Sequence, residues 1–149
     1  MAVTMRPAVA DDQDAIRMII RASMLNPLGL EWSRFLVVEE SGGLIGIGQV
    51  KPHRGGMREL ASIAVVPEWQ GNGVGAAIVR ALLSRETGPI YLMCARPTRI
   101  FYERFGFQEV RGAQIPGYFR PFALMGALVS RLSRSERYAL AVMRRDPQP

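Results

Sequence analysis

The chain has 149 residues, a formal net charge of +6 and a single cysteine, and 48% of its residues are apolar. This length and apolar content suit one domain over residues 1–149, and no stretch reaches the roughly 18 apolar residues of a membrane span. One cysteine excludes an internal disulfide framework, and the N-terminus has no apolar signal core, so we expect a cytoplasmic protein.

The positive charge is spread along the chain. It comes almost entirely from arginine, since Lys51 is the only lysine, and the longest basic run is Arg144-Arg145. A basic surface attracts polyanions in general, but no nucleic-acid motif accompanies these residues. We therefore expect a solvated basic surface and no nucleic-acid partner. Clusters of cysteine and histidine are missing from the sequence as well, so no metal site is expected.

Hydrophobic periodicity divides the chain into alternating strand and helix patterns, separated by turn signals such as Ser41-Gly42-Gly43 and Gly88-Pro89. This alternation predicts an α/β or α+β domain with a mixed sheet. The predicted strands are 3–6, 35–39, 44–50, 57–66, 90–94, 107–110 and 138–143, and the predicted helices are 11–24, 76–86 and 97–104.

An additional segment, 112–136, stands before the last strand. Its central run, 122–129, is apolar on every helical face for two turns, so we expect a helix that is buried on most sides. Three roles stay open for it: the wall of a ligand site, a contact in a homodimer, or a cap on the end of the sheet. A membrane-surface role is disfavoured, because the run is short and lacks a polar face.

The most informative segment is Gln70-Gly71-Asn72-Gly73-Val74-Gly75, which lies between the apolar run 63–66 and a helix pattern. Glycines at alternate positions keep side chains out of the turn and let a ligand reach the backbone. Free N–H groups and the helix dipole favour an anion there, typically a phosphate. The bland alternative is a glycine-rich turn without a ligand.

Three kinds of phosphate loop are compared with this segment. A P-loop ends in Gly-Lys-Ser/Thr, whereas Gly75 is followed by two alanines. Gly71-x-Gly73-x-x-Ala76 matches a dinucleotide-binding pattern, but Arg96 stands where an acidic residue would hold the ribose, and the run of βαβ units is missing. The third pattern, Gln-x-x-Gly-x-Gly, resembles the pyrophosphate loop of the GNAT superfamily of acyl-CoA-dependent N-acyltransferases.

A second motif strengthens the resemblance. Residues 101–107, Phe-Tyr-Glu-Arg-Phe-Gly-Phe, are similar to the Tyr-Glu…Gly-Phe signature near the C-terminus of GNAT domains. The opening strand and helix and the segment 63–71 are similar to the family too. The resemblance covers about residues 3–110 and the closing strand, with 112–136 outside it. Ala95 and Thr98 depart from the family, which often has asparagine and alanine there, so an expected contact to the pantetheine arm is missing.

The resemblance implies a GNAT fold, with a mixed, mostly antiparallel central sheet in which two parallel strands splay apart. It implies acetyl-CoA as co-substrate, with the pyrophosphate on the glycine loop and the pantetheine arm along 63–66. One N–H of that strand would meet the thioester carbonyl, where negative charge develops during acyl transfer. The cofactor-binding residues implied in this way are Ile63, Ala64, Val65, Val66, Gln70, Gly71, Asn72, Gly73, Val74, Gly75 and Ala76.

Two catalytic residues are implied by the same motifs. Tyr102 stands where many members place a general acid, and a phenol stays protonated at neutral pH and can donate to a leaving thiolate. Glu59 stands where histone-type members carry a basic glutamate, and period-two alternation predicts that it shares a strand face with Ile63 and Val65. The alternatives are an aromatic core position for Tyr102, an ion pair between Glu59 and Arg58, and a water chain as the base.

These residues predict an N-acetyltransferase that moves acetyl to a small amine by direct attack in a ternary complex. Segments 58–62 and 93–99 loosely resemble N-acetylglutamate-synthase-like members, so an amino-acid N-acetyltransferase is one alternative. A non-catalytic acyl-CoA sensor or partner-binding module is the other. A covalent route through Cys94 is disfavoured, because a lone buried cysteine is usually a small core residue. His53 is expected on a solvated hairpin.

Overall fold

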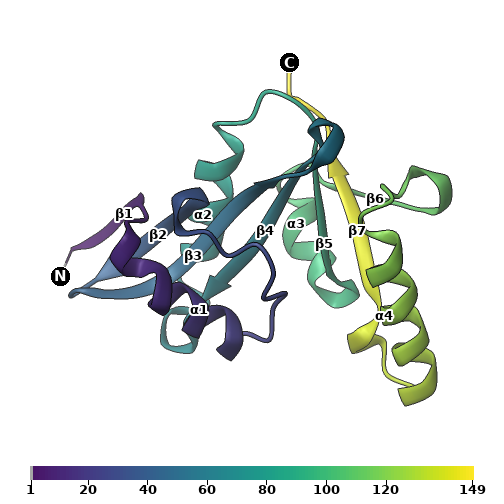
Figure 1. The fold of residues 1–149 in the computed structure, drawn as a ribbon, viewed down its shortest axis with the longest axis horizontal. Coiled ribbons are helices and arrows are strands. Elements are labelled where there is room, and N and C mark those ends of the chain that lie inside the picture. The colour runs from purple at the N-terminus through teal and green to yellow at the C-terminus, as the bar shows by residue number, and fades with distance from the viewer. Residues whose placement is uncertain (1) are drawn as a thin grey trace. The chain divides into compact units, whose positions relative to one another are not determined.

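The computed structural model describes residues 2–149, and Met1 lies outside the described residues. The chain divides into two compact units, residues 1–86 and 87–149, which are described separately. The order of elements, βαβββαβαβαβ, agrees with the sequence prediction (Figure 1). The single domain over 1–149 stays a prediction.

The first unit is an antiparallel sheet in the order β1-β2-β3-β4, with one helix on each face. Strands β2, β3 and β4 follow one another through short turns, whereas α1 lies in the connection between β1 and β2. Its elements are β1 Val3–Pro7, α1 Gln13–Ala22, β2 Phe35–Glu40, β3 Gly43–Pro52, β4 Arg58–Val65 and α2 Val74–Leu83.

Helix α1 covers one face of this sheet, which Figure 1 shows as the helix crossing in front of the strands. Ile16 and Ile20 are one turn apart on the helix, and both are buried in a core cluster with Val37, Ile47 and Ala64 of the strands. Because only this stripe of α1 is buried, the other residues of the helix are available to line the surface on either side of it.

Helix α2 covers the opposite face and lies close to β3. A Cβ atom built on Gly46 would lie 2.8 Å from Val74 of α2, and one on Gly48 would lie 2.6 Å from Ile78. Residues at even positions of β3 face α2, and Ile47 between them faces α1, as the period of a strand requires. Glycine at these two positions lets the helix backbone approach the sheet more closely than any side chain would allow.

An ion-pair cluster joins the first strand to the helix that follows it. The guanidinium of Arg6 donates to both oxygens of Asp12, at 2.7 and 3.1 Å, and to Glu39 on β2. The bond from Arg6 holds the pKa of Asp12 below its ordinary value, although partial burial opposes the shift. The backbone N–H of Val9 also donates to Asp12, so this carboxylate fixes the start of the helical segment.

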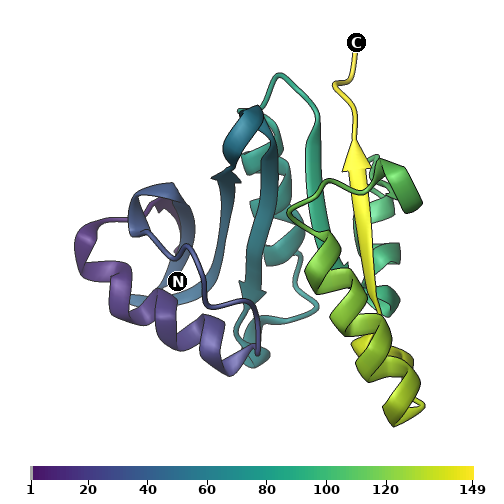
Figure 2. The ribbon, with the colours of Figure 1, turned by 45° about the vertical axis from the view of Figure 1, so that its right-hand side comes forward.

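The second unit has three antiparallel strands in the order β5-β7-β6. Figure 2 shows α4 lying along β7. Phe119, just before α4, is fully buried and anchors the start of that helix. The elements of this unit are β5 Ile90–Ala95, α3 Arg99–Glu103, β6 Gln108–Val110, α4 Arg120–Ser133 and β7 Leu140–Arg145.

The helix in the segment 112–136 is present, but the expectation that it is buried on most sides is wrong. Leu124 is 74% exposed and Leu132 is 77% exposed. The helix packs through Phe122, Ala123 and Gly126 instead, and a Cβ on Gly126 would lie 2.6 Å from the carbonyl oxygen of Tyr138. The apolar run of α4 therefore has two faces. One packs against Tyr138, and the other is exposed to solvent.

We predict that Gly48→Ala destabilises the protein, because the added methyl group would meet Ile78, Ile63 and Leu82 at 2.6, 2.7 and 3.1 Å. Overpacking of this kind typically costs about 1–3 kcal/mol. Gly43→Ala is the matched control in the same strand, since its Cβ would meet only a backbone oxygen at 3.8 Å. Urea unfolding followed by circular dichroism measures both. Equal midpoints for the two variants would contradict the close contact between α2 and β3.

Candidate acyl-donor and proton-transfer site

The glycine loop is exposed and is shaped by its own side chains. Gly71 and Gly73 both have φ of +79°, a conformation that favours glycine, and a Cβ on either would meet nothing within 4 Å. Gln70 donates from Nε2 to the carbonyl of Val65 at 3.0 Å, and Asn72 donates to the carbonyls of Trp69 and Gln70 at 3.2 Å. These bonds hold the loop in shape and leave open space in front of its backbone.

Helix α2 starts directly from this loop. Gly73 is its N-cap, and no side chain among the described residues caps the helix there. The first bond of the ladder runs from Ala77 N–H to Gly73 O at 3.0 Å, so the N–H groups of Val74, Gly75 and Ala76 have no helical acceptor. Unpaired N–H groups at the positive end of a helix dipole form a site for an anion such as a phosphate.

Strand β4 contains a bulge just before the predicted pantetheine segment. Ala61 pairs with Gln49, whereas Ala64 pairs with Ile47, so β4 has one residue more than β3 over this stretch. Ser62 has φ of +60°. A bulge takes backbone groups out of the ladder and so leaves them available to a ligand.

The bulge overturns one expectation from the sequence. Glu59 pairs with Lys51, and the register shift puts it on the same face as Ala61 and Ala64. Ile63 faces α2 instead, where it contacts the Cβ position of Gly48. Strict period-two alternation predicted that Glu59 would share a face with Ile63 and Val65, and this is wrong because the extra residue reverses the alternation.

An apolar pocket of about 350 Å³ adjoins the glycine loop. The end of β4 and the residues after it form one side, and α1 forms the other. No residue of α1 was predicted from the sequence to bind the cofactor, because the exposed apolar positions of this helix resemble ordinary surface residues. The lining residues are Met18, Ile19, Ala22, Ser23, Val65, Val66, Pro67 and Gln70.

Glu59 is buried, and its carboxylate contacts a histidine. Nε2 of His53 lies 2.8 Å from Oε1 of Glu59, and their side chains are 16% and 7% exposed. The expected position of His53 on a solvated hairpin is therefore wrong. The pairing of Glu59 with Arg58 is wrong as well, because Arg58 donates to Glu86 at 2.6 and 2.8 Å.

Lys51 is the third charged group of this cluster. It is 4% exposed, stands opposite Glu59 on β3, and donates from Nζ to the carbonyl of Leu28 at 2.7 Å. Burial lowers the pKa of Lys51, the charge of Glu59 opposes that shift, and Arg34 adds to it. Lys51 and Glu59 therefore place groups of opposite charge opposite each other on neighbouring strands.

The loop over residues 25–30 is tied to the sheet and α1 by three side chains. Besides the bond from Lys51, Gln49 donates to Gly29 O at 3.2 Å and to Ser62 Oγ at 2.8 Å, and Gln13 donates to Leu30 O at 2.6 Å. Gln49 thus links this loop to the bulge. Its Oε1 is buried, and no partner for it is found among the described residues.

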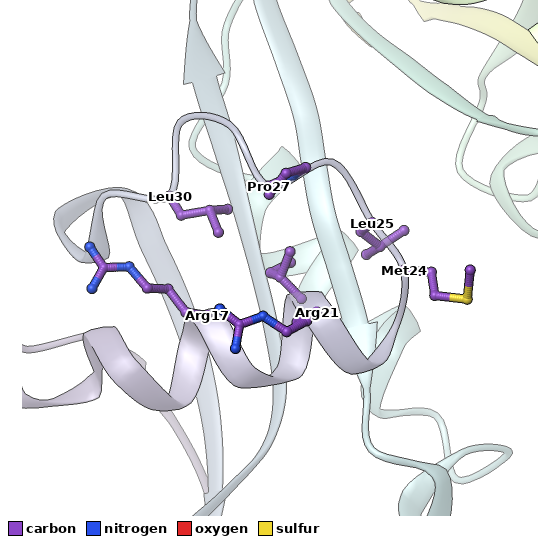
Figure 3. Close-up of a pocket in the computed structure, with 7 residues that line it drawn as sticks. Arg17, Arg21, Met24, Leu25, Pro27 and Leu30 are labelled. Atoms are coloured by element: carbon purple, nitrogen blue, oxygen red, sulfur yellow. The ribbon is translucent and has the colours of Figure 1, made fainter.

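A second cavity, of about 630 Å³, lies on the other side of α1 from the first. Figure 3 shows the residues that line this second cavity. Arg17 and Arg21 of the helix project along one wall, and Pro27 and Leu30 of the loop form the opposite wall. Helix α1 therefore separates a basic cavity from the apolar pocket beside the glycine loop.

Tyr102 lies on α3 in the second unit, among aromatic rings. Its ring meets Phe101 edge-on at 5.0 Å and Phe107 at 6.1 Å between centroids. Burial raises the pKa of Tyr102 above its ordinary value, and the nearby Cys94 adds to the increase. The phenol is therefore fully protonated at neutral pH, as a proton donor must be. This position is compatible with both roles considered for Tyr102, an aromatic residue of the core and a general acid.

No group of three or more metal-ligating side chains occurs among residues 2–149. None of the described helices is long and apolar enough to cross a membrane.

The model of a family described as an acetyltransferase (GNAT) domain matches residues 31–109, more than half of the chain. No curated protein matches the sequence.

The solved structures similar to this chain include N-acetylglutamate synthase from Neisseria gonorrhoeae with CoA and N-acetyl-glutamate, at a TM-score of 0.75 and 19% identity. That match covers 100% of this chain and 36% of the other, so this chain spans about a third of that protein's length. Rv2747 from Mycobacterium tuberculosis, solved with CoA, gives 0.72 at 21% identity over 97% of this chain and 99% of the other. Ard1 from Thermoplasma volcanium gives 0.71 at 19% identity over 100% of both chains.

These likenesses confirm the predicted fold class, an α/β fold of the GNAT type with a mixed, mostly antiparallel sheet. They also show that CoA occupies structures of this fold. The roles predicted for individual residues stay predictions.

We predict that Cys94 reacts very slowly with thiol reagents in the folded protein. Burial, with a smaller contribution from Glu109, raises the pKa of its thiol to about 12. Because only the thiolate attacks, the reaction with Ellman's reagent at pH 8 should be on the order of a thousandfold slower than that of free cysteine. The chain unfolded in guanidinium is the control and should react at the ordinary rate. A fast reaction in the folded state would reopen the acyl-cysteine route.

Proposed function

Because this chain belongs to the GNAT family of acetyltransferases, we propose that it transfers an acetyl group from acetyl-CoA to the amine of a small molecule. The observation that carries the proposal is the glycine loop, in which Gly71 and Gly73 adopt left-handed conformations before an uncapped helix. This arrangement suits a pyrophosphate, which carries negative charge and needs close access to backbone N–H groups.

We place the donor along one continuous surface of the first unit. The pyrophosphate lies on Gln70 to Ala76, and the pantetheine arm follows the backbone of residues 63–66. The apolar pocket between α1 and the end of β4 adjoins both segments and accepts the uncharged part of the arm. Met18, Ile19, Ala22 and Ser23 of α1 thereby join the predicted cofactor-binding residues.

The reaction follows from the chemistry of a thioester. The lone pair of a neutral amine attacks the thioester carbon, a C–N bond forms, and the carbonyl oxygen becomes an oxyanion. Collapse of this intermediate breaks the C–S bond and releases the CoA thiolate, which takes up a proton, while the nitrogen loses one. Backbone N–H groups freed at the β4 bulge are the proposed donors to the oxyanion.

Glu59 is the proposed proton acceptor. An alkyl amine is mostly an ammonium at neutral pH and must lose a proton before it attacks. The ionised carboxylate of Glu59 serves this purpose, and His53, at 2.8 Å, orients it and provides a second site for the proton. Ile63 is four positions after Glu59, about 13 Å along a strand, so a water relay carries the proton.

Tyr102 is the proposed donor to the leaving thiolate. Its pKa is raised by burial, so the phenol keeps its proton until a strong base forms beside it. A thiolate released in a desolvated site is such a base, because loss of hydration raises its pKa as well. Cys94 takes no part, because its own pKa is raised to about 12.

An amino acid is the acceptor class with the most support. The fold is similar to that of N-acetylglutamate synthase solved with CoA and N-acetyl-glutamate. Two short segments of the chain resemble such enzymes as well. A non-catalytic acyl-CoA sensor is the alternative from a different class, and it requires CoA binding without turnover.

We predict that Gly73→Asn weakens CoA binding more than about tenfold, because a side chain there enters the space meant for the pyrophosphate. Asparagine tolerates the left-handed conformation of Gly73, so the backbone keeps its shape. Gly42→Asn is the matched control, since Gly42 has the same φ of +79° and equally open surroundings in the β2–β3 turn. Titration calorimetry measures both. Unchanged affinity in Gly73→Asn would contradict the pyrophosphate site.

The function is tested by thiol release from acetyl-CoA with a panel of amino acids, polyamines, aminoglycosides and peptides. On the best acceptor, we expect Tyr102→Phe to lower kcat by about 10²–10⁴ and Glu59→Gln to lower it most near neutral pH. The loss in Glu59→Gln shrinks as pH rises, because the amine then arrives deprotonated. Tyr138→Phe and Glu136→Gln, at exposed positions, are controls.

Two outcomes contradict parts of this proposal. CoA binding without thiol release from any acceptor identifies a sensor. Full turnover in both Tyr102→Phe and Glu59→Gln rejects the proton-transfer roles and leaves the transferase assignment intact.

A further inference from the structure

Helix α4 presents a row of large apolar side chains to solvent. Leu124, Leu128 and Leu132 recur every four residues, so they lie above one another on one face, and they are 74%, 51% and 77% exposed. Met125, 61% exposed, widens the face. We call these four residues the leucine face. Single exposed apolar residues are ordinary, but a contiguous group of this kind usually marks an interaction site.

The opposite face of α4 is fixed, so the leucine face cannot turn inward. Gly126 lies so close to Tyr138 and Leu140 that a Cβ would come within 2.6 Å of the former and 3.0 Å of the latter. Phe122 stacks on Tyr118 at 5.5 Å, and Ser130 donates to Ser135 O at 2.8 Å. These contacts form a packed face that the sequence pattern did not reveal. A membrane-surface role was disfavoured because the run is apolar on every side, and this reason no longer holds, since one side is packed inside the protein.

The charged side chains of the segment that contains α4 have one sign. Residues 110–135 contain four arginines and no aspartate or glutamate. Arg120 and Arg131 are eleven residues apart, three turns of a helix, and so lie on the same edge of the leucine face. Arg134 follows at the C-terminal end of the helix. A surface that combines leucines with arginines alone is complementary to a partner that is both apolar and anionic.

A second copy of the chain fits these features poorly. Two α4 helices packed through their leucine faces would bring arginines from both copies together without acidic partners within 110–135. A lipid surface needs neither acidic side chains nor a large complementary protein surface.

We propose that α4 docks on an anionic lipid bilayer. The leucine face enters the boundary between headgroups and acyl chains, and Arg120, Arg131 and Arg134 meet the lipid phosphates. A helix of 14 residues, about 21 Å long, lies flat in this boundary with its apolar side about 5–10 Å deep. Binding is reversible, since a single short helix gives modest affinity, and the net charge of +6 adds attraction at long range.

The test uses the full chain and two kinds of vesicle, pure phosphatidylcholine and phosphatidylcholine with roughly 30% phosphatidylglycerol. Flotation should recover the protein with the anionic vesicles only, and about 1 M salt should reduce the recovery by screening. Leu124→Gln with Leu128→Gln should weaken binding at least about tenfold, because two large apolar groups no longer enter the bilayer. Arg120→Gln with Arg131→Gln should weaken it for the anionic vesicles.

Matched controls distinguish binding through the leucine face from nonspecific binding by other apolar or basic residues. Met24→Gln with Leu28→Gln removes two apolar side chains that are 88% and 60% exposed in the first unit. Arg54→Gln with Arg85→Gln removes the same charge from exposed positions elsewhere. Both pairs should bind vesicles nearly as the parent does. Glutamine favours helices, and circular dichroism checks that each variant is folded.

Three outcomes overturn the proposal. The first is no flotation with anionic vesicles, and the second is equal binding to both kinds of vesicle. In the third, light scattering gives a dimer for the parent and a monomer for the leucine variant, which makes a second copy the occupant of this face.

Discussion

The close approach of α2 to β3 is the constraint on which the rest of the first unit depends. At Gly46 and Gly48 the sheet carries no side chain, and the methyl and methylene groups of Val74, Ile78 and Leu82 occupy that space. Dispersion and apolar burial are strongest where surfaces fit closely, so this contact fixes the height and direction of the helix. The glycine loop leads directly into α2. The close contact at Gly46 and Gly48 therefore fixes the position of the loop as well.

A second constraint acts on the opposite face, where the buried groups are polar. Gln49, Lys51 and Glu59 are all nearly inaccessible to water, and each contacts at least one polar partner: a loop carbonyl, a serine or a histidine. Burial of polar groups is tolerated only when they are paired, so this network specifies a single arrangement of the 25–30 loop. The side chains that hold this loop in place therefore include those proposed to transfer the proton.

Much of the fold was predictable from the sequence, because local patterns determine it. Period-two and period-3.6 patterns located the strands and helices, and the glycine loop has a local signature. Three features were not predictable for the same reason: each depends on contacts that lie outside a single local sequence pattern. The bulge at Ser62 appears only in the pairing of β4 with β3, and it changed the face assigned to Glu59. The division of α4 into a packed and an exposed face depends on Tyr138 and Leu140, which no helix pattern contains. The partnership of His53 with Glu59 likewise joins two strands through a turn.

Helix α1 has a cavity on either side and only a narrow buried stripe between them. An element with few buried contacts has a small local free energy of unfolding, so it opens more often than the strands beneath it. A molecule that fills the pocket beside Val65 supplies contacts that the folded helix alone lacks, and its binding energy becomes part of the stability of α1. By mass action, a ligand at a hundred times its dissociation constant adds about 2.7 kcal/mol to the folded state. The local stability of α1 therefore depends on the concentration of the ligand as well as on the sequence.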